Sequence, residues 1–414
     1  MRSKPLISLF VLAMVLVGFA LQSSRRPETA APQAIGKLVL PDLPVNDVER
    51  VITVSQGSTS TVVKTDTGWT LAEKHGYPAS FERIRNAVIK LSELKIGDQR
   101  RVTSETRKDF GVVPPDPSQP DATRVELLGK DGKVLAALLL GKHHLRKGQE
   151  SSPYGGGDYP DGRYVSTDEG SNVYLVKDPL TEFSAQTLGW METELLNVDA
   201  AEVSRITLTG PDREPLEISK SGTDNALQVS NLAATEESDA AKLSSLHSAL
   251  AYLNLQDVAD PALGDAAMGF DNPDSFTAET PDGRVYKLLI GAKTADGARY
   301  LRGHAEFREP TPPPADTNTL ADAATTNAPA VSDTSATRAT VDALNRKLTS
   351  WTFVIPSYKA ESMVLTRSEL VKPKTTPETD SDSDAMDIPP APAVVSPPVT
   401  TAADTNTPSH EEVP

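Results

Sequence analysis

The sequence predicts an α+β protein: two tandem copies of a mainly antiparallel sheet with helices on one face, after an N-terminal transmembrane helix. Three observations support this prediction. They are an uncharged apolar segment near the N-terminus, patterns that recur in one order at shifts of 150–162 residues, and Asp-Gly pairs between apolar runs. Such hairpins join neighbouring strands directly, so they favour antiparallel sheets over strand–helix–strand crossovers.

Composition and charge exclude several classes of protein. The chain has 414 residues, 41 Lys and Arg against 57 Asp and Glu, a formal net charge of −16 and no Cys. The acidic balance argues against a nucleic-acid partner, because such a protein needs a basic surface to replace the counterions of the phosphates. Without Cys, there is neither a lipoprotein anchor nor a disulfide requirement on export.

The N-terminal segment predicts a membrane anchor over residues 1–26. Residues 5–24 are uncharged and are flanked by basic residues, and as a helix these 20 residues would span about 30 Å, the thickness of the hydrocarbon layer. We expect an uncleaved single span in the inner (cell) membrane, with the body on the periplasmic side. A cleaved signal peptide and a buried soluble helix are the alternatives. Residues 27–44 would form a linker.

Two apolar stripes of equal spacing are the first sign of an internal duplication. Both have the spacing 3-4-3, which places four side chains on one face of a helix. The positions are Phe81, Ile84, Val88 and Leu91, and, 162 residues later, Leu243, Leu246, Leu250 and Leu253. We therefore expect two equivalent helices.

Glycine turns and hairpins follow each stripe in the same order. Gly111 and Gly269 are each followed by an apolar residue, two variable residues and Pro. An Asp-Gly pair then separates two apolar runs, first at Asp131–Gly132 and again at Asp282–Gly283. We expect a type I′ turn at both pairs, because this turn needs positive φ at both central residues.

A short helix that ends in Trp is expected to close each copy. Its apolar positions are Leu180, Phe183, Thr187 and Trp190, and, 161 residues later, Val341, Leu344, Leu348 and Trp351. Asp178 and Pro179 would supply the N-cap and first residue of the earlier helix. We interpret these matched features as a duplication, with repeats over residues 45–198 and 199–360. Two unrelated α+β domains with similar periodicity are the alternative.

The expected strands also come in matching order. An opening strand is followed by two short strands, the helix, the hairpin and a strand that begins Arg-Tyr. The matched strands are Val48–Val54, Thr61–Lys64, Trp69–Leu71 and Arg163–Val165, and then Val203–Leu208, Leu216–Ile218, Leu227–Val229 and Arg299–Leu301.

Two low-complexity stretches interrupt or follow the second repeat. A Pro-, Ala- and Thr-rich insert at about 309–336 occupies the place where the first repeat has the strand-like segment Val173–Val176. Residues 361–414 form an acidic, Pro-rich tail, in which one basic residue stands against eight acidic ones from Pro373 onward. We expect both stretches to be disordered, because they cannot bury enough apolar surface to offset the entropy of the chain.

The sequence contains no recognisable catalytic or cofactor-binding constellation. The pair His143–His144 has no further Cys or His nearby, and adjacent strand residues point to opposite faces, so we expect no metal site there. The loop that contains Tyr154 and Tyr159, together with Tyr164, is a candidate contact surface for a partner. We therefore predict no catalytic residue, no cofactor and no metal.

The chain resembles the domain of unknown function 4340 family of bacterial envelope proteins. The motifs that carry this resemblance are Gly68–Leu71, Tyr77–Ala79, Phe110–Val112, Leu140–Gly141, Arg163–Val165, Val173–Val176 and Trp190. They cover residues 5–200 well and residues 200–358 as a weaker second copy.

The resemblance implies a non-enzymatic, membrane-anchored accessory subunit of an ABC-type transport system. Members are typically tethered to the inner membrane and tend to occur beside an ABC permease, an ATPase and a gliding-motility-type auxiliary membrane protein. A binding module for envelope polysaccharide, which would use Tyr and Trp faces, is the main alternative. A hydrolase with a Ser or Asp beside His75 or His247 is a third hypothesis.

Overall fold

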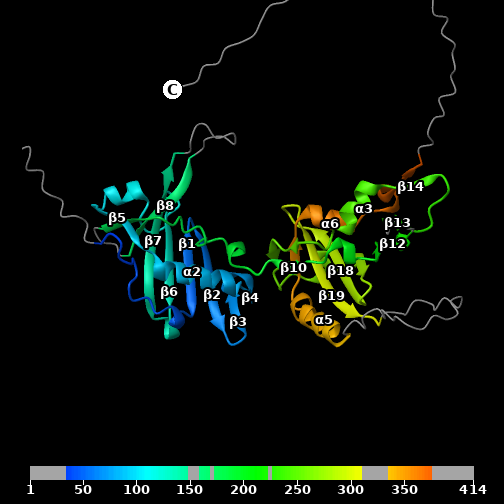
Figure 1. Cartoon of the computed structure of the whole chain (residues 1–414), viewed down its shortest axis with the longest axis horizontal. Coiled ribbons are helices and arrows are strands. Elements are labelled where there is room, and N and C mark those ends of the chain that lie inside the picture. The colour runs from blue at the N-terminus through cyan, green and yellow to red at the C-terminus, as the bar shows by residue number, and fades with distance from the viewer. Residues whose placement is uncertain (1–33, 148–157, 168–171, 222–225, 310–333, 375–414) are drawn as a thin grey trace, which may run out of the picture. The chain divides into compact units, whose positions relative to one another are not determined.

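The computed structural model of the chain describes residues 34–147, 158–167, 172–221, 226–309 and 334–374 (Figure 1). These residues form mainly antiparallel sheets with a few helices, which confirms the antiparallel α+β character predicted from the hairpins. No described helix is long and apolar enough to cross a membrane. The predicted anchor, most of the predicted insert, and the tail from residue 375 lie outside the described residues.

The first large sheet has the strand order β4-β3-β2-β1-β6-β7-β8-β9-β5. Its strands are β1 (Arg50–Ser55), β2 (Ser58–Thr65), β3 (Gly68–Leu71), β4 (Tyr77–Pro78), β5 (Ile96–Arg101), β6 (Thr123–Leu128), β7 (Val134–Arg146), β8 (Tyr159–Ser166) and β9 (Asn172–Val176). The strand-to-strand pairings in this sheet are antiparallel. The helix α2 (Phe81–Glu93) connects β4 to β5.

The second large sheet has the strand order β13-β12-β11-β17-β18-β19-β20-β16. Its strands are β11 (Arg205–Thr209), β12 (Leu216–Ser221), β13 (Ala226–Val229), β16 (Asp257–Val258), β17 (Asp274–Glu279), β18 (Arg284–Lys293), β19 (Arg299–Phe307) and β20 (Phe353–Ile355). The helices here are α3 (Ala240–His247), α4 (Asp265–Met268), α5 (Thr334–Leu348), α6 (Ser357–Met363) and α7 (Arg367–Leu370). Two small sheets pair β10 (Glu194–Leu196) with β15 (Leu253–Asn254) and β14 (Glu236–Ser238) with β21 (Val371–Pro373).

Eight neighbouring strands of the first sheet, from β3 to β5, match the second sheet strand by strand. In each sheet the opening strand lies between the strand that follows it and the first strand of the Asp-Gly hairpin. The three strands are β2, β1 and β6 in the first sheet, and β12, β11 and β17 in the second. The strand that follows the helix, β5 or β16, pairs at the far edge with β9 or β20. The counterpart of β9 is therefore β20, which follows α5. Our placement of the insert at the position of β9 was wrong, because the insert precedes α5.

The helix α2 buries only three of its four predicted apolar residues. Ile84, Val88 and Leu91 are buried together with Ala87, whereas Phe81 is 61% exposed. The backbone N–H of Ser80 donates to the carbonyl of Trp190 at 2.8 Å, which holds the entry to the helix against another segment. Phe81 consequently lies outside the core.

The helix α3 ends six residues before the last residue of its apolar stripe. Leu243 and Leu246 lie on the helix, but Leu250 is in the following turn and Leu253 begins β15, although all four are buried. After the helix ends, the ammonium of Lys359 on α6 donates to the carbonyl of Ala251 at 2.6 Å, which holds the turn in place. The stripe correctly identified buried residues but not the extent of the helix.

The two predicted Trp-ending helices have different outcomes. The helix α5 forms and buries Val341 and Leu348, but it is 15 residues long and ends before Trp351. The segment from Leu180 to Trp190 contains only a short 3₁₀ turn at Thr187–Gly189. The carboxylate of Asp178 accepts the N–H of Leu180 at 2.8 Å, and Leu180 takes a φ of 50°, so Asp178 stabilises a turn and does not cap a helix.

The two Asp-Gly hairpins use different turns. Asp131 and Gly132 have φ values of 59° and 75°, as a type I′ turn requires. At the second hairpin only Gly283 has positive φ, at 87°. The N–H of Gly283 donates to the carbonyl of Thr280 at 3.0 Å, so Pro281 and Asp282 are the central residues of this turn. The ring of Pro281 holds its φ negative, so the expectation of a second type I′ turn was wrong.

The ordered body continues past residue 360, where we placed the start of the tail. Both α6 and α7 lie there in whole or in part, and Ala360, Met363 and Leu370 are buried. The hydroxyl and backbone N–H of Thr366 both contact the carboxylate of Glu369, which forms a capping box at the start of α7. The apolar residues between 360 and 370 supply enough burial to fold, so this boundary was set too early.

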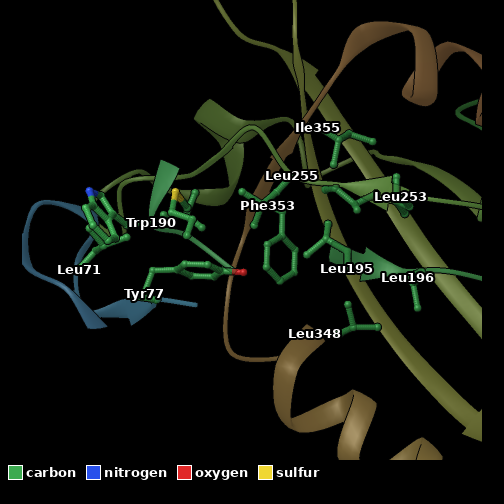
Figure 2. Close-up of a cluster of buried hydrophobic side chains, with 14 of the residues drawn as sticks. Leu71, Tyr77, Trp190, Leu195, Leu196, Leu253, Leu255, Leu348, Phe353 and Ile355 are labelled. Carbon is green, nitrogen blue, oxygen red and sulfur yellow. The ribbon is translucent and has the colours of Figure 1, made fainter. Parts of the chain in front are cut away.

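Buried aromatic residues join the two halves of the body. The ring of Tyr77 on β4 lies 5.1 Å from that of Trp351 and 6.5 Å from that of Phe353, both edge-on. Its hydroxyl donates to the carbonyl of Glu192 at 2.9 Å. Figure 2 shows Tyr77 extending toward Phe353 inside this apolar cluster. A strand of the first sheet thus packs directly on residues beside and within β20.

Candidate functional site

The three predicted contact tyrosines have different surroundings. Tyr154 lies outside the described residues. Tyr159 begins β8 and is 48% exposed. Tyr164, on the same strand, is half-buried and packs edge-on against Phe110, with 4.8 Å between ring centroids. Tyr159 is therefore open to a partner, while Tyr164 belongs to a preformed aromatic group.

Four side chains form what we call the first-sheet patch: Arg100, Phe110, His144 and Tyr164. The ring of His144 lies 6.2 Å from that of Tyr164, and the guanidinium carbon of Arg100 lies 5.9 Å from the centre of Phe110. His144 is oriented by Asp161, because its Nδ1 lies 2.6 Å from a carboxylate oxygen of that residue. Tyr and Arg, two of the four residues, are types that often dominate binding energy at protein interfaces.

Two glycines bring Phe110 to this patch. Gly111 has a φ of 67° and ends the 3₁₀ turn that carries Phe110. Gly141 of β7 lies directly beneath, and a Cβ built there would be 2.1 Å from the carbonyl oxygen of Phe110. We call this close approach of two backbone segments at a glycine a glycine crossing. A second one occurs in the second sheet, where a Cβ on Gly291 would lie 2.2 Å from the carbonyl oxygen of Met268. Only glycine permits such close approach of two backbones.

Arg163 is buried behind the patch and secures the same crossing. Its Nε donates to the carbonyl of Gly141 at 2.8 Å, and its Nη1 donates to that of Leu180 at 3.3 Å. Burial lowers the pKa of Arg163 to about 10, and the nearby charge of Asp121 acts in the opposite direction. Arg299 repeats the contact, with its Nε 2.8 Å from the carbonyl of Gly291. Both arginines therefore hold a crossing.

Sequence reasoning found Tyr164 but missed its companions. Arg100 and Phe110 lie on separate segments and join Tyr164 only through the β5–β9–β8 pairing and the glycine crossing. His144 was considered only as a metal ligand. Within the described ranges, no group of three or more His, Cys, Asp and Glu side chains is arranged to hold a metal ion. The sequence signal that relates to the glycine crossings is the Gly followed by an apolar residue that recurs after each predicted helix, at Gly111–Val112 and Gly269–Phe270.

His247, considered above as a base for a hydrolase, is half-buried on α3. Its Nε2 is buried and has no hydrogen-bond partner among the described residues. Desolvation lowers the pKa of His247 below its usual 6.5; backbone groups of Val203 oppose this shift and the charge of Lys220 reinforces it. Burial therefore favours the neutral imidazole of His247 over its protonated form in the folded chain.

We predict that His247 makes the fold less stable in mild acid. The unfolded chain binds a proton at His247 near pH 6.5, while the folded chain binds it only at lower pH, so stability decreases as pH falls through 6.5. The variant His247→Gln should lose less stability between about pH 7.5 and pH 5.5 than the wild type. Thermal unfolding at both pH values measures this, and equal losses in the two proteins would contradict it.

The three tryptophans are not equivalent. Trp190 is 1% exposed and its Nε1 donates to the carbonyl of Ser184 at 3.0 Å, as expected for a core residue. Trp69 and Trp351 are only partly buried. Trp351 also lines a cavity of about 670 Å³ beside β19. Trp190 is thus a core residue, whereas Trp69 and Trp351 are in the core only in part.

Comparison with known proteins identifies one relationship. Residues 69–273 match the model of a family described as a domain of unknown function (DUF4340). The match begins in β3 and ends just before β17, so it extends into the second sheet. No curated protein and no solved structure matches the chain.

Proposed function

Because the chain belongs to the DUF4340 family over residues 69–273, we propose that it is a non-enzymatic, membrane-anchored accessory protein that contacts a partner through the first-sheet patch. The partner in this proposal is an ABC permease or auxiliary membrane protein of a gliding-motility-like transport system. The observation that carries the proposal is the patch itself. The glycine crossing positions Phe110, and Tyr164 packs edge-on against it at 4.8 Å, so these two rings are in place before any partner arrives, which reduces the entropic cost of binding.

The proposed location rests on the N-terminal sequence. Residues 1–26 would anchor the chain in the inner membrane and place both sheets on the periplasmic side. Protease treatment of intact spheroplasts should then degrade the body of the protein. A body that stays intact under these conditions, while a periplasmic marker is degraded, would refute this location.

The two sheets, in this proposal, are copies of one unit. The shared strand order supports it, as do the matching contacts of Arg163 and Arg299 with a glycine carbonyl, each at 2.8 Å. The glycine crossings beneath them also match. An experimental structure in which the eight matched strands fail to superimpose would refute the duplication.

We predict that removing the patch weakens partner binding. The variants Tyr164→Ala and Arg100→Ala should each reduce the amount of ABC permease that co-purifies with the full chain from detergent-solubilised membranes, by about tenfold. Arg100 is exposed, so its variant tests the contact without disturbing the core.

Tyr358→Ala is the matched control, because Tyr358 is 68% exposed on α6 and far along the chain from the patch. It should co-purify with the permease as the wild type does. The proposal fails if the full-length chain is recovered alone in the soluble fraction, or if both patch variants retain the permease.

A second candidate function, binding of an envelope polysaccharide, is favoured by the partly exposed aromatic residues. Tyr159 and Tyr164 would supply the ring faces on β8 in this alternative. If immobilised glycan retains the wild type but not Tyr159→Ala or Tyr164→Ala, polysaccharide binding is favoured over permease binding. The cavity lined by Trp351 is a separate site that also has an aromatic side chain in its wall.

A further inference from the structure

We infer that a cavity in the second sheet is a binding site for a neutral saccharide. The cavity has a volume of about 670 Å³ and lies between the loop after β16, the strand β19 and the turn from α5 to β20. Its polar and aromatic lining includes Asp260, Asp265, Arg302, His304 and Trp351. The inference does not depend on the first-sheet patch or on a transporter partner, since none of these residues belongs to the patch.

Arg302 is held in place before any ligand binds. Its Nε donates to the hydroxyl of Thr352 at 2.9 Å, and its Nη2 donates to the carboxylate of Asp265 at 2.7 Å. The guanidinium carbon lies 4.2 Å from the centre of the Phe270 ring. Among the described residues Nη1 has no acceptor, so a fixed cationic donor remains for a ligand that enters the cavity.

Trp351 provides an aromatic surface that is also fixed. The edge-on contact with Tyr77 at 5.1 Å supports the indole from the side of the core. In contrast to Trp190, whose Nε1 donates to a backbone carbonyl, Trp351 Nε1 has no acceptor among the described residues. An indole that lines a cavity with its N–H available can stack against an apolar ring face and donate one hydrogen bond.

Asp260 adds an acceptor to these donors. One of its carboxylate oxygens accepts the backbone N–H of Ala262 at 2.9 Å, which orients the side chain. The other oxygen has no partner among the described residues. The cavity therefore combines donors from Arg302 and Trp351, an acceptor from Asp260 and an aromatic ring.

This set of groups fits a sugar better than an anion. A pyranose has hydroxyls that both donate and accept and a C–H face that packs on an aromatic ring, so it satisfies all four features together. An anion would be repelled by Asp260, and the charge of Arg302 is already paired with Asp265. The volume lies within the range of roughly 300–1,000 Å³ that is usual for small-ligand sites.

The test uses the full chain and three named probes, cellotriose, maltotriose and chitotriose, with inorganic phosphate as the anionic comparison. Calorimetry should detect at least one of the sugars with a Kd of about 1 mM or tighter, and phosphate should not bind. The variants Asp260→Asn and Trp351→Phe should weaken that sugar at least about tenfold. The first keeps an oxygen for Ala262, and the second keeps a ring against Tyr77, so both should fold.

Trp69→Phe is the matched control, because Trp69 is a partly buried tryptophan on β3 outside this cavity. It should bind the sugar as the wild type does, and it should retain the fluorescence change on binding that Trp351→Phe loses. The inference is overturned if none of the three sugars binds, if only phosphate binds, or if both cavity variants bind with wild-type affinity. Co-purification of the permease does not enter this test, so its outcome is independent of the proposed accessory role.

Discussion

The variant Gly141→Ala is expected to destabilise the fold by about 3 kcal/mol or more. The new Cβ would lie 2.1 Å from the carbonyl oxygen of Phe110 and 2.9 Å from a methyl carbon of Val112. Neither atom can yield easily, because one belongs to the backbone and the other to a fully buried residue. Overpacking of a close contact commonly costs about 1–3 kcal/mol, and a clash with backbone lies at or above the upper end.

Urea denaturation with Gly264→Ala as control measures this effect. A Cβ on Gly264 would meet nothing within 4 Å, so that variant should cost no more than about 1 kcal/mol, the loss expected when Ala replaces the N-cap residue of α4. The variant Gly291→Ala, at the equivalent crossing in the second sheet, should resemble Gly141→Ala. If Gly141→Ala and Gly264→Ala have equal free energies of unfolding, the backbone at the glycine crossing of Gly141 accommodates the new methyl group without strain, which contradicts the prediction.

The variant Tyr77→Ala should cost about 3–5 kcal/mol, the usual range for removing a buried aromatic ring. Tyr77 is 1% exposed and packs on Trp351 and Phe353, so its loss would leave a cavity where the two halves of the body meet. Burial also raises the pKa of Tyr77, with the charge of Glu192 acting in the same direction, so the hydroxyl remains a donor.

A graded series separates the ring from the hydroxyl. Tyr77→Phe should cost only about 1 kcal/mol, because it removes one hydrogen bond to the carbonyl of Glu192 and keeps the packing. Tyr358→Ala, at a tyrosine that is 68% exposed, should change the free energy of unfolding by less than about 0.5 kcal/mol. If Tyr77→Ala is no worse than Tyr358→Ala, the packing between the halves does not contribute to stability.

Patterns that depend on neighbouring residues predicted the fold well. The stripe on α2 identified Ile84, Val88 and Leu91 as core residues, because helical period and burial on one face are local properties. Asp131–Gly132 identified a type I′ hairpin for the same reason. Even where a helix ended early, as at α3, the apolar spacing still marked buried positions.

The candidate sites could be predicted only in part. Tyr159 and Tyr164 were found as exposed or half-exposed aromatic residues near a glycine-rich loop. Arg100 and Phe110 were missed because they reach Tyr164 across strand pairings between distant segments. Trp351 was placed on the apolar face of a helix, and the sequence does not indicate that it packs on Tyr77 and also lines a cavity.

The amino-acid sequence alone determined the antiparallel α+β class, the family and most buried positions, because these follow from periodicity, turn chemistry and motifs of a few residues. The tertiary structure decided which of these residues are exposed and which segments meet. Phe81 is excluded from the core, and the segment at Leu180 forms a turn and no helix, since contacts with distant parts of the chain, such as that of Arg163 with the carbonyl of Leu180, outweigh the local preference. Both the first-sheet patch and the cavity beside Trp351 arise from such long-range contacts, which no local pattern contains.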